Sequence, residues 1–465
     1  MKLSQKEILK AVRGKLIVAT TGEKITGVST DTRTVKRGDL FIPLKGRNYD
    51  AHSFLEEAFK KGAVGALVEK KSLSFNHHRF FIIQVPSTLR ALGDLATYWR
   101  QQFKIPVVAV TGSNGKTTTK EMIFQILKQK YRTLKTEGNL NNLIGLPQTL
   151  FRLSGRDQAA VVEMGMNAPG EIDRLAEIAS PQAGVITNIG HAHLEGLGSL
   201  RAVAKAKGEL LKRLPSNGTA ILNADDGETK FLKKLCHSRQ VNFGLRKATY
   251  QAFQVRLKGL RGCSTRGMEF LLKKTKKTER FEIPLVSVTA VSNALAAIAV
   301  GDLLSVSWPQ MKKGLKNFRP PPNRMQIKKI RNLLVLDDTY NANPDSMKAA
   351  LKTLHSLTVK GRRKVAILGE MLELGRYENK GHREVGQEAA VSGLDLLVTI
   401  GRRAAGIAAG ARQERFEKIR TFGNFEKAKR SLPSLLRPND VILLKGSRGA
   451  RMERFLELFT KGGLA

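Results

Sequence analysis

The stretch 107-VVAVTGSNGKTTTK-120 decides the fold. A run of small apolar residues stops at Thr111, and the loop that follows has the pattern Gly-x-x-Gly-Lys-Thr before a helical segment begins. A buried strand, a glycine-rich turn and a helix start form a phosphate cradle in this order, because the glycines let amide N–H groups face an anion at the positive end of the helix dipole. The stretch therefore predicts a nucleotide-binding α/β protein.

Each position of this loop has an expected role. Lys116 is expected beside the terminal phosphates, and the Thr117 hydroxyl is expected to hold Mg²⁺. The full P-loop pattern has a glycine where this chain has Val110, so the loop is a shorter variant, and a plain strand-to-helix turn is the alternative interpretation. The strand before it and the helix after it favour nucleotide binding. The loop residues expected to contact ATP are Thr111, Gly112, Ser113, Asn114, Gly115, Lys116, Thr117 and Thr118.

Strand-like and helix-like segments alternate along the rest of the 465 residues, a length typical of about three domains. Short apolar runs in residues 106–318 are typical of buried parallel strands, and the basic segments near 250 and 270 predict an exposed strand or hairpin. A proline-rich linker, 318-FRPPPNR, precedes a region that alternates strand and helix throughout. We expect a small N-terminal α/β domain (1–105), a central P-loop ATPase-like parallel-sheet domain (106–318) and a C-terminal Rossmann-like doubly wound domain (319–465).

The chain is strongly basic, with 80 Lys and Arg against 40 Asp and Glu and a formal net charge of +40. Such a charge attracts polyanions, so action on nucleic acid is an alternative function. The basic residues are spread along the whole chain, and the densest run, 272-LKKTKKTER-280, has no aromatic residues for base stacking. We therefore expect non-specific, salt-sensitive polyanion binding and no specific nucleic-acid partner.

No apolar run approaches the ~18 residues that span a bilayer. The N-terminus has no signal-peptide core, and Ser4 with Glu7 predicts a capping box that opens a short helix. We expect a cytoplasmic protein without a membrane span. Cys236 and Cys263 have no metal-binding or redox spacing, so no disulfide is expected.

Polar side chains follow several of the expected strands. Open parallel sheets bind ligands beyond the carboxyl ends of their strands, and Mg²⁺ prefers carboxylate and phosphate oxygens. Glu163 is therefore a candidate Mg²⁺ ligand, with a helix-capping carboxylate as the alternative. For His191 or His193 alone, a structural role is the favoured interpretation. Asp337 and Asp338 follow another such strand.

Several stretches together carry a family resemblance: 138-GNLNNLIGLP, 161-VVEMGMNAPGEI, 187-TNIGHAHLEGLGS, 204-AKAKGEL, 336-LDDTYNANPDSM, 368-LGEMLELG and 444-LKGSRGARME. With the loop, they resemble the Mur ligases, which are ATP-dependent amide-forming ligases of peptidoglycan precursor synthesis, and within them the MurF type. The resemblance covers essentially the whole chain. Its most specific part is the run at 337–344, whereas all Mur ligases and the folylpolyglutamate synthases share the glycine-lysine loop.

The resemblance implies the reaction and its cofactors. ATP would phosphorylate the terminal carboxylate of a UDP-N-acetylmuramoyl-tripeptide, and the amine of D-alanyl-D-alanine would then attack the acyl phosphate. ATP and Mg²⁺ are the implied cofactors, and the two peptide substrates are the implied partners. We expect a monomer whose outer domains close over the central ATP site.

The resemblance also assigns residues by motif. Lys116 and Thr117 match the contacts of the β- and γ-phosphates and one Mg²⁺, with Glu163 as a further ligand. His193 matches the histidine of the second metal because it precedes Leu-Glu, and His191 does not match. Lys207 matches the lysine that Mur ligases carbamylate, which would create an anion for the second Mg²⁺; an exposed helix lysine is the alternative. The implied catalytic and metal set is thus Lys116, Thr117, Glu163, His193 and Lys207.

The remaining assignments fall into groups. Residues matching the nucleotide-binding positions are Asn293, Arg324 and Asp338, the last for the ribose. Residues resembling the UDP-binding surface are Ser29, Thr30, Asp31, Arg33, Lys45 and Gly46. Residues expected to face the acceptor substrate or to form the dipeptide pocket are Asn139, Asn142, Asn341, Asn343 and Ser447. The family's His-Asn-x-x-Asn-Ala and Gly-Arg-Met appear here as 289-TAVSNA-294 and 323-NRM-325, which affects details of the adenine pocket.

Three alternatives remain at this stage. Another amide ligase of the same superfamily would add a single amino acid or glutamate, although residues 336–346 argue against it. A basic P-loop NTPase would act on nucleic acid, but no recognition motif supports it. A scaffold that keeps the fold without catalysis is disfavoured because the catalytic set is complete.

Overall fold

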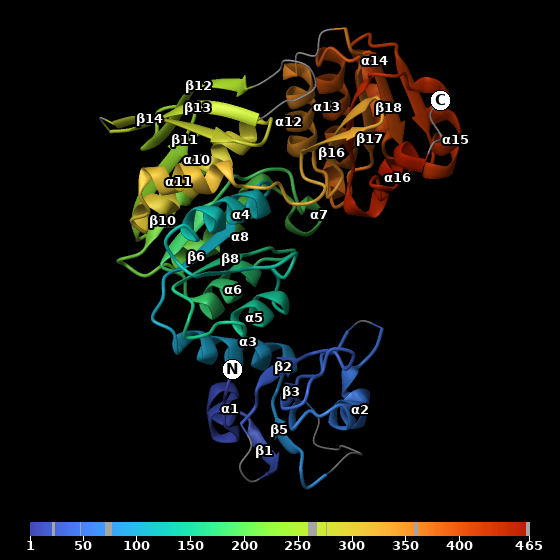
Figure 1. The fold of residues 1–465 in the computed structure, drawn as a ribbon. Helices are drawn as coiled ribbons and strands as arrows, with labels where there is room; N and C mark the ends of the chain where they lie inside the picture. The colour runs from blue at the N-terminus through green and yellow to red at the C-terminus, as the bar shows by residue number, and fades with distance from the viewer. Residues whose placement is uncertain are drawn as a thin grey trace.

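The computed structural model describes residues 1–20, 24–46, 48–69, 77–258, 267–275, 277–357 and 361–461. Three sheets follow one another along the chain, and Figure 1 shows the N-terminal one at one end, the central one in the middle and the C-terminal one beside it. The expected α/β class with three sheet-containing regions is confirmed. Cys263 lies outside the described residues, and Cys236 is a buried free thiol.

The N-terminal sheet has the order β1-β5-β4-β3-β2, with β1 antiparallel to β5 and the other pairs parallel. Its strands are β1 (Lys15–Val18), β2 (Gly27–Ser29), β3 (Asp39–Phe41), β4 (Gly65–Val68) and β5 (Phe81–Gln84). Its helices are α1 (Gln5–Val12), η1 (Ala51–Phe54), α2 (Leu55–Lys60) and α3 (Thr88–Gln101). The capping box predicted at Ser4 and Glu7 opens α1. Helix α3 packs on this sheet through Leu92 and Leu95 and reaches the central core through Ala96.

The central sheet has nine strands in the order β14-β13-β12-β11-β10-β9-β6-β8-β7. They are β6 (Val107–Thr111), β7 (Thr133–Lys135), β8 (Ala159–Glu163), β9 (Ala183–Ile186), β10 (Thr219–Asn223), β11 (Arg239–Gly244), β12 (Tyr250–Lys258), β13 (Gly267–Lys274) and β14 (Lys277–Ile283). From β7 to β12 every pairing is parallel, and β12, β13 and β14 form an antiparallel edge. The basic edge strands predicted near 250 and 270 are confirmed.

The helices of the central region are α4 (Lys116–Leu127), α5 (Gly145–Leu150), α6 (Glu171–Ala179), α7 (Leu194–Leu197), α8 (Leu200–Lys212), α9 (Thr229–Lys234), α10 (Val288–Leu303) and α11 (Trp308–Lys316). Helix α10 is mostly apolar and packs between α4 and the sheet. In the sheet, Val110 pairs with Glu163 on one side and with Val185 on the other. The carboxyl ends of β6, β8 and β9 therefore meet at one edge.

The C-terminal sheet has the order β15-β16-β20-β17-β18-β19. Its strands are β15 (Gln326–Ile330), β16 (Leu333–Asp338), β17 (Lys364–Gly369), β18 (Leu396–Ile400), β19 (Ile419–Phe422) and β20 (Val441–Lys445). Its helices are α12 (Pro344–Ser356), η2 (Gly375–Tyr377), α13 (Glu378–Val391), α14 (Ala405–Gln413), α15 (Phe425–Leu435), η3 (Arg448–Ala450) and α16 (Arg454–Lys461). Separate apolar cores cover the two faces, as the doubly wound prediction requires. The sheet differs from the expected parallel arrangement at β15, a polar edge strand that runs antiparallel to β16.

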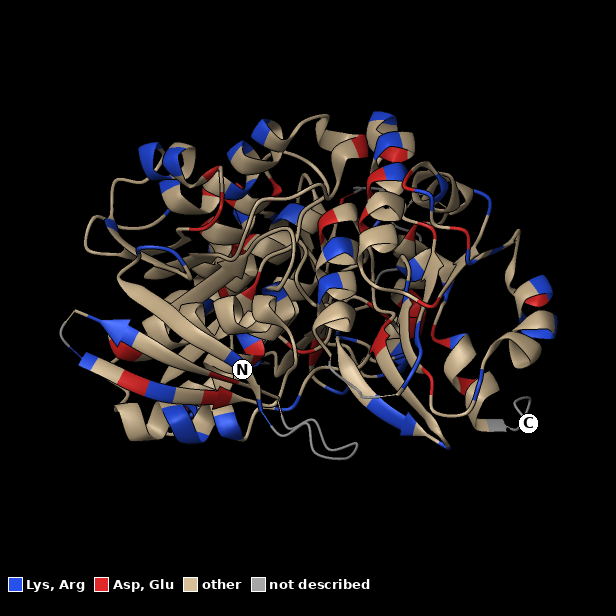
Figure 2. Cartoon of the chain, turned by 90° about the horizontal axis from the view of Figure 1, so that it is seen from above, with Lys and Arg blue, Asp and Glu red and all other residues tan. Residues whose placement is uncertain are grey.

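Charged residues are scattered over all three regions, with Asp and Glu between the Lys and Arg (Figure 2). Many cations have partners: Lys312 pairs with Glu279, and Lys258 pairs with Glu282, on the central sheet's edge. The described parts of the chain contain no helix that combines the length and the apolar character needed to span a bilayer.

Candidate active site

A cavity of about 650 Å³ lies between the central and C-terminal regions. One wall is formed at the carboxyl ends of the central strands, by Gly115, Glu163 and Asn223 among others. The opposite wall comes from the C-terminal region and includes Asp338 and Ser447. The cavity thus lies where open parallel sheets bind ligands.

The phosphate loop follows β6 and ends at the start of α4. Gly112 and Gly115 have φ values of 145° and 82°, and a Cβ at Gly112 would lie 1.9 Å from Oγ1 of Thr187. Only glycine fits there, because L side chains disfavour positive φ and no space is left for one. The backbone N–H groups of residues 115–118 have no hydrogen-bond partner among the described residues, so they are free to bind an anion at the helix start.

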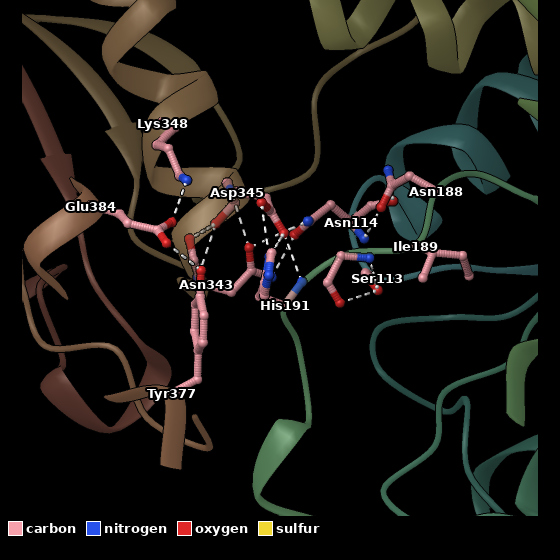
Figure 3. Close-up of polar contacts among 12 residues, drawn as sticks. Ser113, Asn114, Asn188, Ile189, His191, Asn343, Asp345, Lys348, Tyr377 and Glu384 are labelled. Atoms are coloured by element: carbon pink, nitrogen blue, oxygen red, sulfur yellow. Dashed lines mark hydrogen bonds and ion pairs between the residues drawn. The ribbon is translucent and has the colours of Figure 1, made fainter. Parts of the chain in front are cut away.

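Residues 187–190 hold the loop in this shape (Figure 3). The backbone N–H of Ser113 donates to O of Asn188, and the N–H of Asn114 donates to Oδ1 of the same residue, both at 2.9 Å. The Ser113 hydroxyl accepts from the N–H of Gly190. Ser113 and Asn114 therefore use their own amides to shape the loop, which leaves phosphate binding to the residues after them.

Lys116 and Thr117 begin α4 and line the cavity. Nζ of Lys116 donates to O of Gly112 at 2.8 Å, which bends the side chain back over the loop. Burial lowers the pKa of Lys116, and the Glu163 carboxylate acts against that shift. Thr111 does not line the cavity; its hydroxyl donates to O of Met164 and ties β6 to the segment after β8.

Glu163 ends β8 and is 2% exposed. Its Oε1 accepts a hydrogen bond from Nδ2 of Asn141 at 2.8 Å, whereas Oε2 is buried without a partner. An unpartnered buried carboxylate oxygen beside a phosphate loop fits a hard divalent cation. The described residues contain no group of three or more His, Cys, Asp and Glu arranged for a metal ion.

Lys207 lies on α8 and is 1% exposed, so the alternative of a solvent-facing helix lysine is excluded. Its ammonium has no hydrogen bond or ion pair among the described residues. Burial, and then the positive charge of Lys116, lower its pKa well below the usual value. The side chain therefore has a larger neutral fraction at neutral pH than an exposed lysine has.

The nucleotide-side assignments meet in the cavity. Asn293 lies on α10, and a Cβ at Gly115 would be 2.5 Å from its Oδ1. The guanidinium of Arg324 stacks on the Tyr340 ring at 3.9 Å. Asp338 already accepts hydrogen bonds from Nζ of Lys445 at 2.5 Å and from N–H of Met325 at 3.1 Å. Sequence reasoning missed Asn223, Asp225 and Asp226, which also line the cavity; their position at and just after the end of β10 was the available signal.

The proposed dipeptide residues also line the cavity, but their side chains make structural bonds. Oδ1 of Asn341 accepts from the N–H groups of Ala342 and Arg448. Asn343 caps α12 and exchanges side-chain amide hydrogen bonds with Asn114 across the cavity. The Ser447 hydroxyl accepts from N–H of Leu372.

The residues assigned to UDP do not line the cavity, and Ser29, Thr30, Asp31 and Arg33 form a separate cluster in the N-terminal region. Two of them, Asp31 and Arg33, pair at 2.6 Å, and the Arg33 hydrogen bonds lower the pKa of Asp31 to about 2. Thr30 accepts from Nε2 of Gln148 on α5, which links this cluster to the central region. In this cluster the Ser29 hydroxyl donates to O of Asp31. Outside it, Lys45 forms an isolated antiparallel β-bridge with Asp50, and N–H of Gly46 donates to O of Tyr49.

Asn139 and Asn142 occupy different positions. Asn139 is exposed and outside the cavity wall, whereas Asn142 lines the cavity and its Oδ1 accepts from N–H of Ile144 and Gly145 at the start of α5. The neighbour between them in the chain, Asn141, is the one that contacts Glu163.

Two histidines of the loop after β9, His191 and His193, contact the C-terminal region, and Figure 3 shows the contact of His191 with Asp345. Oδ2 of Asp345 accepts from N–H of His191 at 2.7 Å and lies 3.1 Å from its Nδ1. The His191 ring stacks on Tyr377 with centroids 4.5 Å apart. Burial alone would raise the pKa of Asp345, but the hydrogen bonds from His191 outweigh it and the pKa is lowered. His193 lines the cavity, and its Nδ1 is 3.0 Å from Oε2 of Glu373.

Known proteins match the chain along its whole length. Residues 24–100 match the domain described as "Mur ligase family, catalytic domain", 110–301 the "Mur ligase middle domain" and 323–448 the "Mur ligase, glutamate ligase domain". The UDP-N-acetylmuramoyl-tripeptide–D-alanyl-D-alanine ligase of Bacillus subtilis is 38% identical over 463 residues, which cover 98% of each chain. MurF from Acinetobacter baumannii superposes with a TM-score of 0.91 at 31% identity over 99% of each chain. MurF from Thermotoga maritima in complex with ADP superposes with a TM-score of 0.82 at 28% identity, covering 94% of this chain and 97% of that one.

Proposed function

The chain belongs to the Mur ligase family and to its MurF type, and from this membership we propose that it joins D-alanyl-D-alanine to UDP-N-acetylmuramoyl-tripeptide with consumption of ATP. The product is the pentapeptide precursor of peptidoglycan, with ADP and phosphate released. ATP is the energy source because a carboxylate is a poor electrophile, and its phosphorylation supplies a good leaving group.

One observation carries the proposal for the site. The segment 337–344, the most specific part of the resemblance, faces the phosphate loop across a single cavity, and Asn343 contacts Asn114 directly. A carboxylate activated by ATP at the loop would thus be formed beside the proposed dipeptide residues. Such proximity replaces a bimolecular encounter by a reaction between bound groups.

We assign the phosphates and the metal as follows. The free amides of residues 115–118 and the Lys116 ammonium bind the β- and γ-phosphates. The Thr117 hydroxyl and the unpartnered Oε2 of Glu163 hold Mg²⁺, and His193 supplies a nitrogen for a second Mg²⁺. When bound, these ions neutralise the charge that develops on the transferred phosphoryl group.

Lys207 is proposed as the site of a carbamate. A neutral amine can attack carbon dioxide, lose one proton and become an anionic carbamate, and burial beside Lys116 favours the neutral amine. The same positive neighbour would stabilise the resulting anion. The carbamate oxygens would then provide the carboxylate-like ligands that a second Mg²⁺ requires.

The remaining assignments rest on position. Asn293, Arg324 and Asp338 bind the adenosine side of ATP, and Asp338 keeps acceptor capacity for a ribose hydroxyl beside Lys445. The cluster around Asp31 and Arg33 binds the UDP portion of the tripeptide substrate. Residues 1–105, 106–318 and 319–465 would thus bind UDP, activate the carboxylate and bind the dipeptide. We further propose that a monomer acts, in the cytoplasm where ATP is available.

Phosphate release from ATP, measured in the presence of Mg²⁺, tests the proposal. Purified protein should release phosphate only when UDP-N-acetylmuramoyl-tripeptide and D-alanyl-D-alanine are both present, and mass spectrometry should show one pentapeptide product per phosphate. Release with a single amino acid in place of the dipeptide would identify another ligase of the superfamily. Release stimulated by DNA or RNA and indifferent to dipeptide would identify a nucleic-acid NTPase, and no release under any condition would identify a scaffold. Moderate salt should abolish polyanion binding while leaving kcat nearly unchanged.

A further inference from the structure

The segment 368-LGEMLELG-375 begins with the last two residues of β17 and brings a carboxylate to the edge of the proposed metal site. Oε2 of Glu373 lies 3.0 Å from Nδ1 of His193, and both residues line the cavity. The two side chains come from different regions of the chain, and nothing in the proposed reaction uses Glu373. Asp345 and His191 form a second contact of the same kind nearby.

The backbone fixes this contact as well. N–H of Glu195, at the start of α7, donates to O of Glu373 at 3.1 Å. Gly375, with φ of 53°, lies so close that a Cβ there would be 3.0 Å from Cα of Glu195. His193 itself has a positive φ of 58°, a conformation that a non-glycine residue keeps only when its surroundings impose it. The segment from the C-terminal region therefore packs directly on the turn that carries His193.

We propose that Glu373 is a positioning residue for His193. Its carboxylate holds Nδ1 of the His193 imidazole, so that Nε2 faces the second metal ion. A histidine has two ring nitrogens, and the partner of one fixes the tautomer and orientation of the other. Metal-binding histidines usually donate their other N–H to a carboxylate or a carbonyl oxygen, and loss of that partner typically costs about 10- to 100-fold in metal affinity or activity.

The Glu373 carboxylate comes from a different region of the chain than His193, and this couples two events. Because Glu373 belongs to the C-terminal region, His193 is fully oriented only when that region is docked on the central one. Metal binding and docking are thus coupled through one side-chain contact. This inference rests on the proposed function, because it assumes that His193 binds a metal ion beside the nucleotide.

Mn²⁺ affinity in the presence of ADP, measured by electron paramagnetic resonance on the full chain, tests the inference without the reaction. Glu373→Ala should weaken the Mn²⁺ site that depends on His193 about 10-fold, and Glu373→Gln, which preserves the size of the side chain, should weaken it less. Glu414→Gln is the matched control because Glu414 is exposed on the same region and makes no described ion pair. Unchanged affinity in both Glu373 variants would overturn the inference.

A double-mutant cycle separates orientation of His193 from a general effect on docking. In a His193→Ala background, Glu373→Ala should cause no further loss of Mn²⁺ affinity. An equal loss in both backgrounds would show that Glu373 acts through another group and would overturn the inference. If His193→Ala itself left Mn²⁺ binding unchanged, the proposed metal role of His193 would fail instead, so the two failures are distinguishable.

Discussion

Asn141 donates a hydrogen bond to Oε1 of Glu163, whereas Oε2 of the same carboxylate is buried without a hydrogen-bond partner among the described residues. One amide therefore decides which oxygen of Glu163 is available to Mg²⁺. This relationship gives the first prediction.

Asn141→Ala should weaken Mg²⁺ binding and lower kcat by about 10- to 100-fold, because the freed carboxylate can rotate away from the metal. The measurement is the Mg²⁺ dependence of phosphate release. Asn139→Ala is the control, since Asn139 is exposed and does not contact Glu163. If the Asn141 variant kept the wild-type Mg²⁺ dependence, the prediction that Asn141 orients Glu163 for Mg²⁺ would be wrong.

Lys207→Ala should lower kcat by at least about 100-fold, since it removes both the buried amine and the proposed carbamate. Protein equilibrated with ¹³C-bicarbonate should give a carbamate carbonyl signal by NMR that the variant lacks. Lys205→Ala, two residues earlier on the exposed side of α8, should keep both the signal and the activity. Full activity in Lys207→Ala would contradict the assignment.

Asp345→Ala should favour separation of the central and C-terminal regions in the ligand-free protein, because it removes both contacts to His191. A loss of about 1 kcal/mol corresponds to about a fivefold shift in the ratio of docked to undocked chains. Small-angle scattering should show a larger radius of gyration. His237→Ala, an exposed histidine far from this contact in sequence, should leave the scattering profile unchanged.

Arg100→Met should lower the free energy of unfolding by about 2 kcal/mol or more. Arg100 is 4% exposed, and its guanidinium donates to the carbonyl oxygens of Ala179, Phe103 and Ile105. The substitution would leave these acceptors without their donor. Arg90→Met, on the exposed side of the same helix, should change stability by less than about 0.5 kcal/mol. Urea denaturation of both variants measures the difference.

His382 predicts a pH dependence of stability. It is 1% exposed, its Nδ1 lies 2.8 Å from O of Glu378, and its Nε2 accepts from N–H of Met371. Burial lowers the pKa of His382 below 6.5, so the unfolded chain binds the proton more readily. Stability should therefore fall as the pH drops below 6.5 towards the pKa of the folded state.

Urea unfolding between pH 7.5 and about 5 measures this slope. His382→Gln should reduce the slope, although it should also lower stability at pH 7.5, because the buried N–H of Met371 loses its acceptor. A variant with the wild-type slope would show that another group titrates in this range.

Local patterns predicted the fold and the phosphate loop well, because their information lies within a few residues. The glycines at 112 and 115 and the strand before them predict both the turn and the helix after it. The edge strand β15 was missed because its sequence, Gln-Ile-Lys-Lys-Ile, is polar and short, and its pairing with β16 is a tertiary contact.

The site was only partly predictable for the same reason. The choice of Asn139 and Asn142 over Asn141 shows that a loop's sequence does not reveal which of its amides faces a carboxylate. Glu373 and Tyr377 meet the histidines only after the C-terminal region has packed against the central one. Lys207 was identified by resemblance alone, since only the three-dimensional structure shows that it is buried.

The segment after β9 performs two tasks within a few residues. Asn188 and Gly190 shape the phosphate loop, and His191 and His193 contact the C-terminal region. We therefore expect a nucleotide bound at the phosphate loop to change the docking equilibrium of the C-terminal region. Thermodynamic linkage then requires the converse: whatever factor the nucleotide adds to docking, docking must add to nucleotide affinity. A dipeptide bound at the proposed residues on the far side of the cavity would thereby tighten the binding of ATP.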